Sequence, residues 1–564
     1  MSDEPEVLII GAGPVGLSGA LALGRAGIRT LVLERRDELS RYPKANGVHA
    51  RTMEIFQEWG VADSVRKLTE GMPKGAVFLW KTRLNGIDIG ELTITDESEE
   101  VDRMLGALSP ERLSNAGQHM FEPFLAKAAE ELDGVTIRLG AEVVGLSVDD
   151  DKVTAEYTDA DGTRHTVAAQ YVIGADGVRS LVRRTLGIGE HGQESLGTAI
   201  NVQIDADLDP YFGGRILPVV WVANKDTQGA FIRDGATRWR YNFDVPPTTD
   251  PATVSRERCE QEITHAIGEA IPFTIHFTWS WSHDQAVTDT WRKGRAFLAG
   301  DSAHHFPPHG GFGLNSGVQD VHNLAWKLIA RLRWNAGDQL LESYEAERLP
   351  VAEYNGAQCM RNTRDLAKTG FLTQDTAFLE AIETDTEEGE QARAVFAEGV
   401  SAQWEQLASH GQQFGFQYDS SAIAPDGSEI IESSVSEYRP SARPGARAPH
   451  SWVTSRGEKI STVHVYNGGF TLFTGPDGAS WEVAAERLER ELRVPLQILA
   501  LGRDLLPADE TETDLLDRYG LEPRGAVLIR PDGIVGFRSA AGASDGYAEL
   551  RSALTQILDL DSVN

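Results

Sequence analysis

Val7-Leu-Ile-Ile-Gly-Ala-Gly-Pro-Val-Gly16 is the stretch of sequence that decides the fold of this chain. A short apolar run enters a turn with the spacing Gly-x-Gly-x-x-Gly, and residues 17–27 then have the pattern of a helix that ends at a glycine. Residues 30–34 form a second apolar run. Strand, turn, helix and strand in this order predict a βαβ unit whose glycine turn binds a dinucleotide.

Each residue of the motif has a physical task at such a site. Gly11 allows the tight turn, Gly13 lets the backbone approach a pyrophosphate, and Gly16 lets the helix pack closely on the strand. The phosphates would lie at a helix N-terminus, where free N–H groups favour anions. Glu34, at the end of the second strand, can accept hydrogen bonds from the hydroxyls of an adenosine ribose.

A second glycine-rich segment, Gly294-Arg-Ala-Phe-Leu-Ala-Gly-Asp301, lies almost 300 residues further on. Its apolar run predicts a buried strand that delivers Asp301, whose carboxylate can hold a ribityl hydroxyl. Residues 307–315 then form a stiff loop that leads into a helix with apolar residues at every third or fourth position. The positive end of that helix would stabilise the negative charge of a reduced flavin. The pair of segments therefore favours FAD over NAD.

Length and composition limit the other possibilities. A chain of 564 residues is too long for one core, so we expect two to four domains. The formal net charge of -32 repels nucleic acid and anionic membranes, which leaves a small molecule as the expected partner. Two cysteines are too few for a disulfide framework. The acidic start is unlike a signal peptide, and no apolar run reaches about 18 residues, so we expect a cytoplasmic protein.

The sequence predicts an α/β protein with three kinds of domain. An FAD-binding Rossmann-like domain is interrupted by an antiparallel β-sheet that binds the substrate, and a third domain follows a linker. The alternating aromatic pattern between about residues 190 and 290 indicates the inserted sheet. The expected division is 1–185 and 291–400 for the FAD-binding domain with a helical extension, 186–290 for the substrate-binding sheet, 401–440 for the linker and 441–564 for the C-terminal domain.

The motifs together resemble the three fingerprints of single-component FAD-dependent aromatic hydroxylases, the class A flavoprotein monooxygenases. Phenol hydroxylases and chlorophenol monooxygenases look most similar. The segments that carry the resemblance are 11–16, Gly174-Ala-Asp-Gly-Val-Arg-Ser180, and Gly300-Asp-Ser-Ala-His304 with 307–315. The C-terminal region resembles the thioredoxin-like domain that ends phenol hydroxylases. It lacks a Cys-x-x-Cys motif, so a structural role or a homodimer contact is expected of it.

The family implies a function. The enzyme would use NADPH or NADH and O2 to hydroxylate a phenolic or polycyclic aromatic substrate through a C4a-hydroperoxyflavin. No second dinucleotide fingerprint is visible, as expected if NAD(P)H docks only transiently. Two alternatives remain open at this point. One is Baeyer–Villiger or antibiotic-modifying oxygenation on the same fold, and the other is a flavin-binding protein without oxygenase activity.

The resemblance also assigns roles to single residues. Pro308 would border flavin and substrate through its backbone carbonyl. Lys44 stands where the family more often has an arginine and would face the phosphates as a point charge. The residues expected at the cofactor, beside the three motif glycines, are Glu34, Arg35, Lys44, Gln118, Asp176, Asp301, Gly313, Leu314 and Asn315.

A phenol becomes more nucleophilic when it loses its proton, so a base is expected near the substrate. Where a phenol hydroxylase has an acid, this chain has Asn46. The remaining candidates are His49, Tyr241, His283, His305 and His309, of which His309 is favoured because it follows Pro308. His304 and His305 are adjacent rather than four residues apart, so no metal site is expected. Arg233, Arg238 and Arg240 are expected on solvated strand faces.

Overall fold

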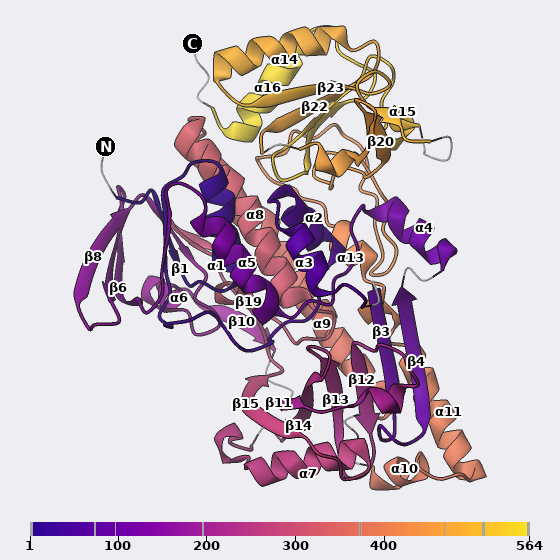
Figure 1. Ribbon diagram of the computed structural model, residues 1–564. Coiled ribbons are helices and arrows are strands. Elements are labelled where there is room, and N and C mark those ends of the chain that lie inside the picture. The colour runs from indigo at the N-terminus through magenta and orange to yellow at the C-terminus, as the bar shows by residue number, and fades with distance from the viewer. Residues whose placement is uncertain are drawn as a thin grey trace.

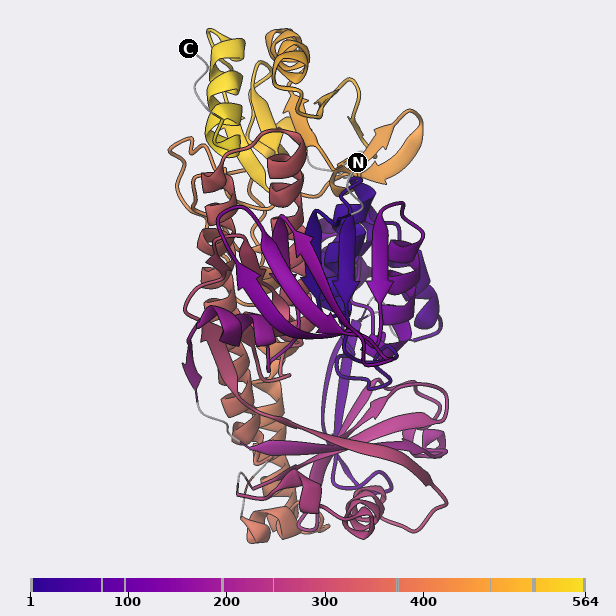
Figure 2. The same cartoon turned by 90° about the vertical axis from the view of Figure 1, so that its left-hand side faces the viewer.

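The computed structural model describes residues 4–72, 75–95, 98–193, 197–246, 248–371, 373, 375–466, 468–509 and 514–560. Figures 1 and 2 show an elongated molecule in which three bodies are stacked along the long axis. We name them the parallel-sheet body in the middle, the antiparallel-sheet body below it and the C-terminal body above it. The α/β class expected from the sequence is confirmed.

A largely parallel sheet forms the middle body. Its strands follow the spatial order β17 (Arg292–Lys293), β18 (Ala296–Leu298), β9 (Tyr171–Gly174), β1 (Val7–Ile10), β2 (Thr30–Leu33) and β5 (Val135–Arg138), and only the pairing of β17 is antiparallel. In Figure 1, helices α1 (Pro14–Arg25), α5 (Gln118–Glu130) and α8 (Phe312–Arg333) lie on one side of this sheet. A small sheet of β6 (Glu142–Val148), β7 (Val153–Thr158) and β8 (Arg164–Ala169) lies on the other. Cover on both faces explains why the central strands read as continuous apolar runs.

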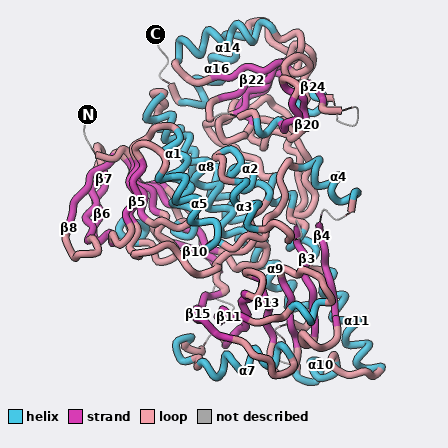
Figure 3. The backbone as a smooth tube through the Cα atoms, viewed as in Figure 1, coloured by secondary structure: helices cyan, strands magenta, loops and turns pink. Residues whose placement is uncertain are grey.

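The antiparallel-sheet body has the order β15 (Thr274–Ser282), β11 (Thr198–Asp205), β14 (Arg238–Val245), β13 (Gln228–Arg233), β12 (Val219–Ala223), β3 (Gly75–Lys81) and β4 (Asp88–Thr95). Helix α7 (Arg256–Ile267) lies at its lower end in Figure 3 and packs on one face through a core that includes Val202, Trp239 and Tyr241. The inserted antiparallel sheet is therefore confirmed. Two of its strands, β3 and β4, come from residues 75–95, which the sequence pattern placed with the first domain. The domain boundaries themselves stay a prediction.

Two long helices connect the bodies. Helix α8 runs along the parallel sheet, and α9 (Asp338–Leu366) continues from beside it to the antiparallel-sheet body (Figure 1). There α10 (Thr376–Ala381) and α11 (Glu387–Ser401) pack with the end of α9 against β3, β4 and β12 through Trp80, Phe371 and Phe396. The opposite face of the sheet from α7 is thus partly covered, and its remaining part faces the middle body.

The C-terminal body has a mixed sheet in the order β23 (Leu496–Ala500), β22 (Phe470–Thr474), β25 (Ala526–Ile529) and β26 (Val535–Ser539), with α14 (Ala479–Leu492) and α16 (Gly546–Leu558) packed on it. Strand β23 is parallel to β22 and the others are antiparallel, which is the thioredoxin-like arrangement that was expected. This body docks on the last turns of α8, where Trp326 and Trp334 pack on Phe470.

Shorter elements complete the chain: α2 (Ala50–Glu58), α3 (Ala62–Leu68), α4 (Glu99–Leu108), α6 (Leu181–Leu186), α12 (Trp404–Leu407), α13 (His410–Phe414), α15 (Leu515–Tyr519), β10 (Glu190–Gln193), β16 (Gln285–Thr288), β19 (His304–His305), β20 (Trp452–Ser455), β21 (Glu458–Ser461) and β24 (Leu506–Pro507). A 3-10 turn, η3 (Gly300–Ser302), follows β18. In the described residues, no helix is both long and apolar enough to cross a bilayer.

Buried histidines make the stability of this fold depend on pH. Burial lowers the pKa of His49 to about 4 and the pKa values of His309 and His450 to about 3. Below pH 6.5 the unfolded chain binds protons at these rings and the folded chain does not, so the free energy of unfolding falls as the pH falls. Each ring contributes a loss of about 1.4 kcal/mol per pH unit in that range.

We therefore expect the urea midpoint to fall steeply between pH 6.5 and pH 5, before the carboxylates titrate. His450 accounts for one of the protons that the chain takes up on unfolding, so His450→Gln should lower stability at pH 7 and flatten this dependence by about one proton. Chemical denaturation at four pH values measures the slope. An unchanged slope in H450Q would show that His450 is not neutral in the folded protein.

Candidate cofactor and substrate site

The parallel sheet brings the three glycine-rich segments to one edge. Leu33, Ile10, Gly174 and Leu298 lie in register across β2, β1, β9 and β18, each as the last residue of its strand. Glu34, Gly11, Asp176 and Asp301 follow these ends within a few residues. The carboxyl edge of an open parallel sheet is where α/β proteins bind nucleotides.

The first and last segments touch each other directly. A Cβ atom on Gly300 would lie 2.8 Å from the side chain of Val15, and one on Gly317 would lie 2.5 Å from it and 3.0 Å from the Gly300 backbone. Val15 is in the first turn of α1, Gly300 is in η3 and Gly317 is in α8. Small residues therefore let the N-terminal turns of α1 and α8 approach one another at the sheet edge.

The glycines of the first motif fit a bound pyrophosphate. Gly11 has a φ of +106°, and a Cβ there would lie 2.3 Å from the carbonyl oxygen of Ala175. A Cβ on Gly16 would collide with the Gly11 carbonyl, whereas Gly13 has no neighbour within 4 Å and faces open space. Helix α1 has no side-chain cap and no acidic residue in its first turn. Its free N–H groups are available to an anion.

Glu34 is nearly buried and already oriented. Its Oε2 accepts a hydrogen bond from the Ala12 amide at 2.8 Å, and its Oε1 accepts from the amide and the Nε of Arg36 at 3.1 and 2.8 Å. Burial acts to raise the pKa of Glu34, but these hydrogen bonds hold the pKa below its usual value. A carboxylate has about four acceptor positions, so one remains for a ribose hydroxyl. Arg35, which was predicted to lie at the cofactor, is exposed, and that role stays a prediction. Its neighbour Arg36 makes the contact with Glu34.

Gln118 and Lys44 lie beside this end of the site. The Gln118 amide donates to Ala45 O at 2.7 Å, and its side chain donates to Glu122 Oε1 at 2.5 Å. Glu122 Oε2 is buried and has no hydrogen-bond partner in the part of the chain that the structure describes, and burial raises the pKa of this carboxyl. Arg36 and Lys44 both act on Glu122 electrostatically, so the four side chains form one cluster. Lys44 itself is exposed.

Asp176 serves the fold with one of its oxygens. Its Oδ2 accepts hydrogen bonds from the amides of Leu181 and Val182, at 2.6 and 3.2 Å, at the start of α6. Its Oδ1 is buried and has no hydrogen-bond partner among the described residues, and burial raises the pKa of the carboxyl. Asp176 therefore has one oxygen left to accept a hydrogen bond, and its cofactor role stays a prediction.

Asp301 is the carboxylate that the surrounding protein leaves free. It is exposed at the end of β18, and its side chain has no hydrogen bond or ion pair within the described residues. Its backbone is fixed, because the Gly300 amide donates to Asp320 Oδ2 at 3.1 Å. The geometry suits a carboxylate that binds a hydroxyl of a ligand.

The N-terminus of α8 points into the same region. Gly311 precedes the helix with a φ of +72°, and the helix has neither a side-chain cap nor an acidic residue in its first turn. Gly313 faces open space and Leu314 is half-buried. Asn315 fixes this turn by accepting from the His49 amide at 2.8 Å and donating to Gly47 O at 2.9 Å. The free positive end of α8 suits an electron-rich ring edge.

The antiparallel sheet presents a row of side chains on the face opposite α7. Six residues in register across six strands share one face: Trp80, Trp221, Ala230, Asn242, Asn201 and Trp279. The Trp80 and Trp221 rings are stacked at 6.3 Å and 9°. Trp221 and Trp279 are four strand spacings apart, roughly 19 Å. Aromatic rings stand at both ends of the row, with small and amide side chains between them.

His309 lies over this row. Its ring is stacked on Trp221 at 6.2 Å and on His283 at 5.8 Å. The Thr363 hydroxyl donates to Cys359 O at 2.8 Å, so it accepts from His309 Nδ1 at 2.9 Å. The proton of the neutral ring is thus on Nδ1, and Nε2 carries a lone pair with no partner in the described part of the chain. Pro308 is exposed, and its carbonyl accepts from the Gly311 amide at 2.9 Å.

The other candidate bases have other positions. Tyr241 lies in the core under α7 with its hydroxyl on Thr227, His305 faces Asp284, and His49 contacts Gly310 O at 3.0 Å. His283 contacts Asp244 Oδ1 at 2.8 Å and stacks on His309. Two of the five predicted bases therefore meet at the sheet face, and Tyr241 is placed away from it.

The sequence pattern predicted that all three sheet arginines lie on solvated strand faces, and this is wrong for two of them. Arg233 is buried over the Trp239 ring and paired with Asp209, and Arg240 is buried and donates to Pro43 O. Arg238 is exposed and pairs with Asp205. Arg36, Trp221 and Thr363 were missed as site residues, because no motif marks them. No group of three or more potential metal ligands occurs in the described residues.

Comparison with known proteins agrees with this geometry. An FAD-binding domain family matches residues 4–358, and the C-terminal domain of the aromatic-ring hydroxylases matches residues 441–560. Tetracenomycin A2 monooxygenase-dioxygenase of Streptomyces glaucescens is 35% identical over 99% of this chain and 97% of its own length. A putative polyketide hydroxylase of Streptomyces halstedii is 34% identical over 98% and 97%.

A solved structure has the same architecture. The flavin-dependent monooxygenase PieE, in complex with FAD and substrate, superposes with a TM-score of 0.88 and 32% identity, over 99% of both chains. The resemblance read from the three motifs is confirmed. The chain belongs to the FAD-dependent aromatic-ring hydroxylases, a family of class A flavoprotein monooxygenases.

Proposed function

We propose that this protein uses FAD, NAD(P)H and O2 to add one hydroxyl group to a fused-ring phenolic compound of the polyketide type. Bound FAD supplies the redox chemistry, since it takes electrons from the nicotinamide and activates O2 for transfer to a ring. The observation that carries the proposal is Asp301, a carboxylate to which no described residue donates a hydrogen bond, beside the uncapped N-terminus of α8.

Different residues of the site would bind different parts of FAD. The N-terminus of α1 would hold the pyrophosphate over Gly13, and Glu34 would accept a ribose hydroxyl. Lys44 and Arg36 add positive charge near the phosphates of a chain with a formal net charge of -32. Asp301 would accept from the ribityl chain, and the N-terminus of α8 would face the flavin ring beside Leu314 and Asn315.

The face of the antiparallel sheet supports a planar substrate of several rings. Trp279 offers a stacking partner at one end of the row, and Trp221 lines the site towards the other end beside His309. Stacked aromatic pairs contribute about 0.5–1.5 kcal/mol beyond burial. Asn242 and Asn201 between them offer amide groups to ring oxygens. Two Streptomyces relatives carry names of this substrate class, one for tetracenomycin A2 and one for a polyketide.

His309 would accept the hydrogen bond of the substrate hydroxyl. Its Nδ1 proton is held by Thr363, so the lone pair of Nε2 is free to accept. Burial, with a smaller contribution from the neighbouring His283, lowers the pKa of His309 to about 3, so the ring is neutral at physiological pH. Such a weak base withdraws a proton most readily from an acidic phenol. Conjugation of the hydroxyl with a ring carbonyl raises its acidity, because the carbonyl delocalises the charge of the phenolate.

The activity can be tested on purified protein with FAD. We expect hydroxyanthraquinones and related fused-ring phenols to stimulate NAD(P)H consumption, and mass spectrometry under ¹⁸O2 to find one labelled oxygen in the product. A simple phenol serves as the comparison and should be turned over more slowly. Consumption of NAD(P)H that yields only hydrogen peroxide with every aromatic tested would refute the proposed hydroxylation.

Asp301→Ala tests the cofactor role of the free carboxylate. Loss of a hydrogen bond to a charged acceptor should weaken FAD binding by about 10- to 100-fold. The matched control is Asp63→Ala, which removes an exposed carboxylate of α3 paired only with Arg66. Fluorescence titration of apoprotein with FAD measures both variants. Equal affinities in D301A and D63A would show that Asp301 does not contact the cofactor.

His309→Gln tests the role of the lone pair on Nε2. The hydroxylation rate should fall by about 100-fold or more, with FAD affinity unchanged. Thr363→Val should have a smaller effect in the same direction, because His309 keeps its ring but loses the partner that fixes its tautomer. His165→Gln, on exposed β8, is the control. Product formation by H309Q at the wild-type rate would exclude this assignment.

A further inference from the structure

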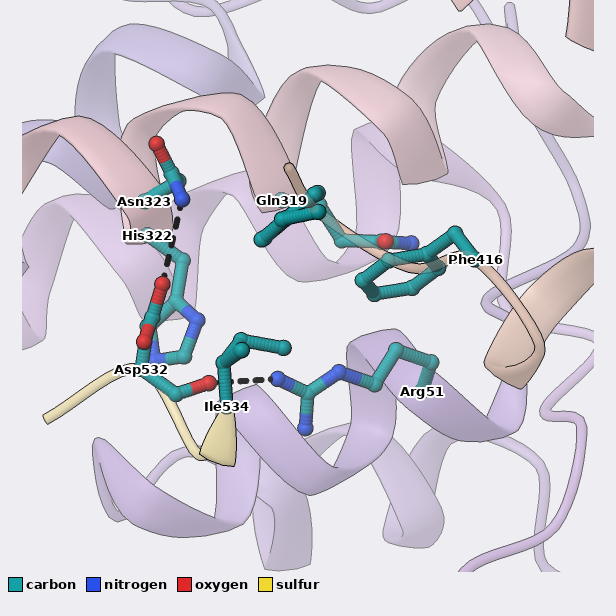
Figure 4. Close-up of a pocket in the computed structure, with 8 residues that line it drawn as sticks. Arg51, Gln319, His322, Asn323, Phe416, Asp532 and Ile534 are labelled. Carbon is teal, nitrogen blue, oxygen red and sulfur yellow. Dashed lines mark hydrogen bonds between the residues drawn. The ribbon is translucent and has the colours of Figure 1, made fainter. Parts of the chain in front are cut away.

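The turn Pro531-Asp532-Gly533 of the C-terminal body reaches into the middle body. It connects β25 to β26 and enters between α2 and α8, as Figure 4 shows for Asp532, Arg51 and Asn323. The Asp532 carbonyl accepts from Arg51 Nη2 at 2.9 Å, and its Oδ2 accepts from Asn323 Nδ2 at 3.1 Å. Asp532 is 2% exposed. One residue of the C-terminal body thus contacts both helices at once.

Buried charges surround this turn. Arg530 donates to Asp532 Oδ2 at 2.6 Å and to both oxygens of Glu347 on α9, at 2.6 and 2.9 Å. Lys327 donates to Glu347 Oε2 at 2.8 Å. Every one of these side chains is 2% exposed or less. Removal of one member of such a cluster leaves an uncompensated buried charge, so the arrangement tolerates few alternatives.

The two helices contacted by Asp532 also shape the flavin end of the site. Helix α2 starts at Ala50, directly after His49, and the His49 amide donates to Asn315 in the first turn of α8. Asn323 lies eight residues further along α8, about 12 Å at 1.5 Å per residue. The separation of α2 and α8 is therefore fixed at two levels, by Asn315 beside the flavin end and by Asp532 behind it.

The C-terminal body is held to α8 by other means. Trp326, Trp334 and Leu340 pack with Phe470 and Leu554 in one apolar cluster. Burial of apolar surface supplies adhesion, whereas a buried ion pair adds little net stability over apolar packing. Buried charged groups make directional hydrogen bonds, and these restrict how the Asp532 turn, α2 and α8 lie relative to one another. Apolar packing is therefore sufficient to dock the C-terminal body, and the buried contacts of the Asp532 turn are not needed for docking.

We propose that Asp532 is a positioning residue for the flavin ring, through which the C-terminal body fixes the spacing of α2 and α8. This inference rests on the proposed function. The turn that carries Asp532 keeps Asn315 and the N-terminus of α8 aligned with the flavin ring. Oxygen transfer to the substrate then competes well with release of hydrogen peroxide. The thioredoxin-like domain, which has no cysteine pair for redox exchange, then acts on the reaction from outside the site.

Asp532→Asn is the test, since it keeps the size of the side chain and removes its charge. We expect the dissociation constant of FAD to rise by about tenfold. Product formed per NAD(P)H consumed should fall several-fold relative to wild type. The matched control is Asp426→Asn, which breaks a partly buried pair with Arg538 on β26 and touches neither α2 nor α8. The control should lower thermal stability without either change.

The outcomes separate positioning from adhesion. A lower melting temperature in D532N with wild-type FAD affinity and coupling would overturn the proposal. If D532N does not fold, Arg51→Lys keeps the charge that pairs with Glu54 and loses the reach to the Asp532 carbonyl, and the same measurements apply. FAD titration needs neither substrate nor NAD(P)H, so failure of the proposed hydroxylation would leave that part of the test intact.

Discussion

The carboxylate of Asp320 is the constraint on which the rest of the site depends. It is fully buried on α8, and its Oδ2 accepts from the Gly300 amide at 3.1 Å and contacts His304 Nε2 at 2.7 Å. Its Oδ1 accepts from Arg348 Nε on α9 at 2.9 Å. Burial alone would raise the pKa of Asp320, but His304 and Arg348 keep the pKa below its usual value. One charge thus ties the end of β18, which carries Asp301, to both long helices.

Glu347, the neighbour of Arg348 on α9, repeats this arrangement, because it is also a buried carboxylate between cationic donors. Glu347 receives donors from Lys327 and Arg530, while Arg348 reaches Asp320 and the Tyr418 hydroxyl at 3.0 Å. Two adjacent residues therefore connect the cofactor edge on one side and the C-terminal body on the other. Apolar clusters hold the bodies together, and these charges select one relative arrangement among those that apolar contact would allow.

The two sheets contribute to the site in different ways. The parallel sheet gathers strand ends, so its functional groups lie in turns where the backbone is fixed and the side chains are free. The antiparallel sheet contributes a face. Its alternation sends Trp239 and Tyr241 into the core and Arg240 and Asn242 toward the middle body, because successive side chains of a strand point to opposite faces. A tyrosine that looks like a base in sequence is therefore a core residue, and the neutral His309 lies over the opposite face of the sheet.

The sequence by itself determined the cofactor end of this protein. Gly11, Gly16 and Glu34 are set by local rules, since backbone dihedrals, turn geometry and strand periodicity depend on residues close in the chain. Parallel strands must also end at one edge, so Asp301 could be placed beside them from its motif alone. Only the tertiary structure decided that β3 and β4 join the distant sheet, that Thr363 fixes the proton of His309, and that Asp532 lies between α2 and α8. These contacts join residues up to several hundred positions apart, and burial and packing set them without leaving a period or spacing in the chain.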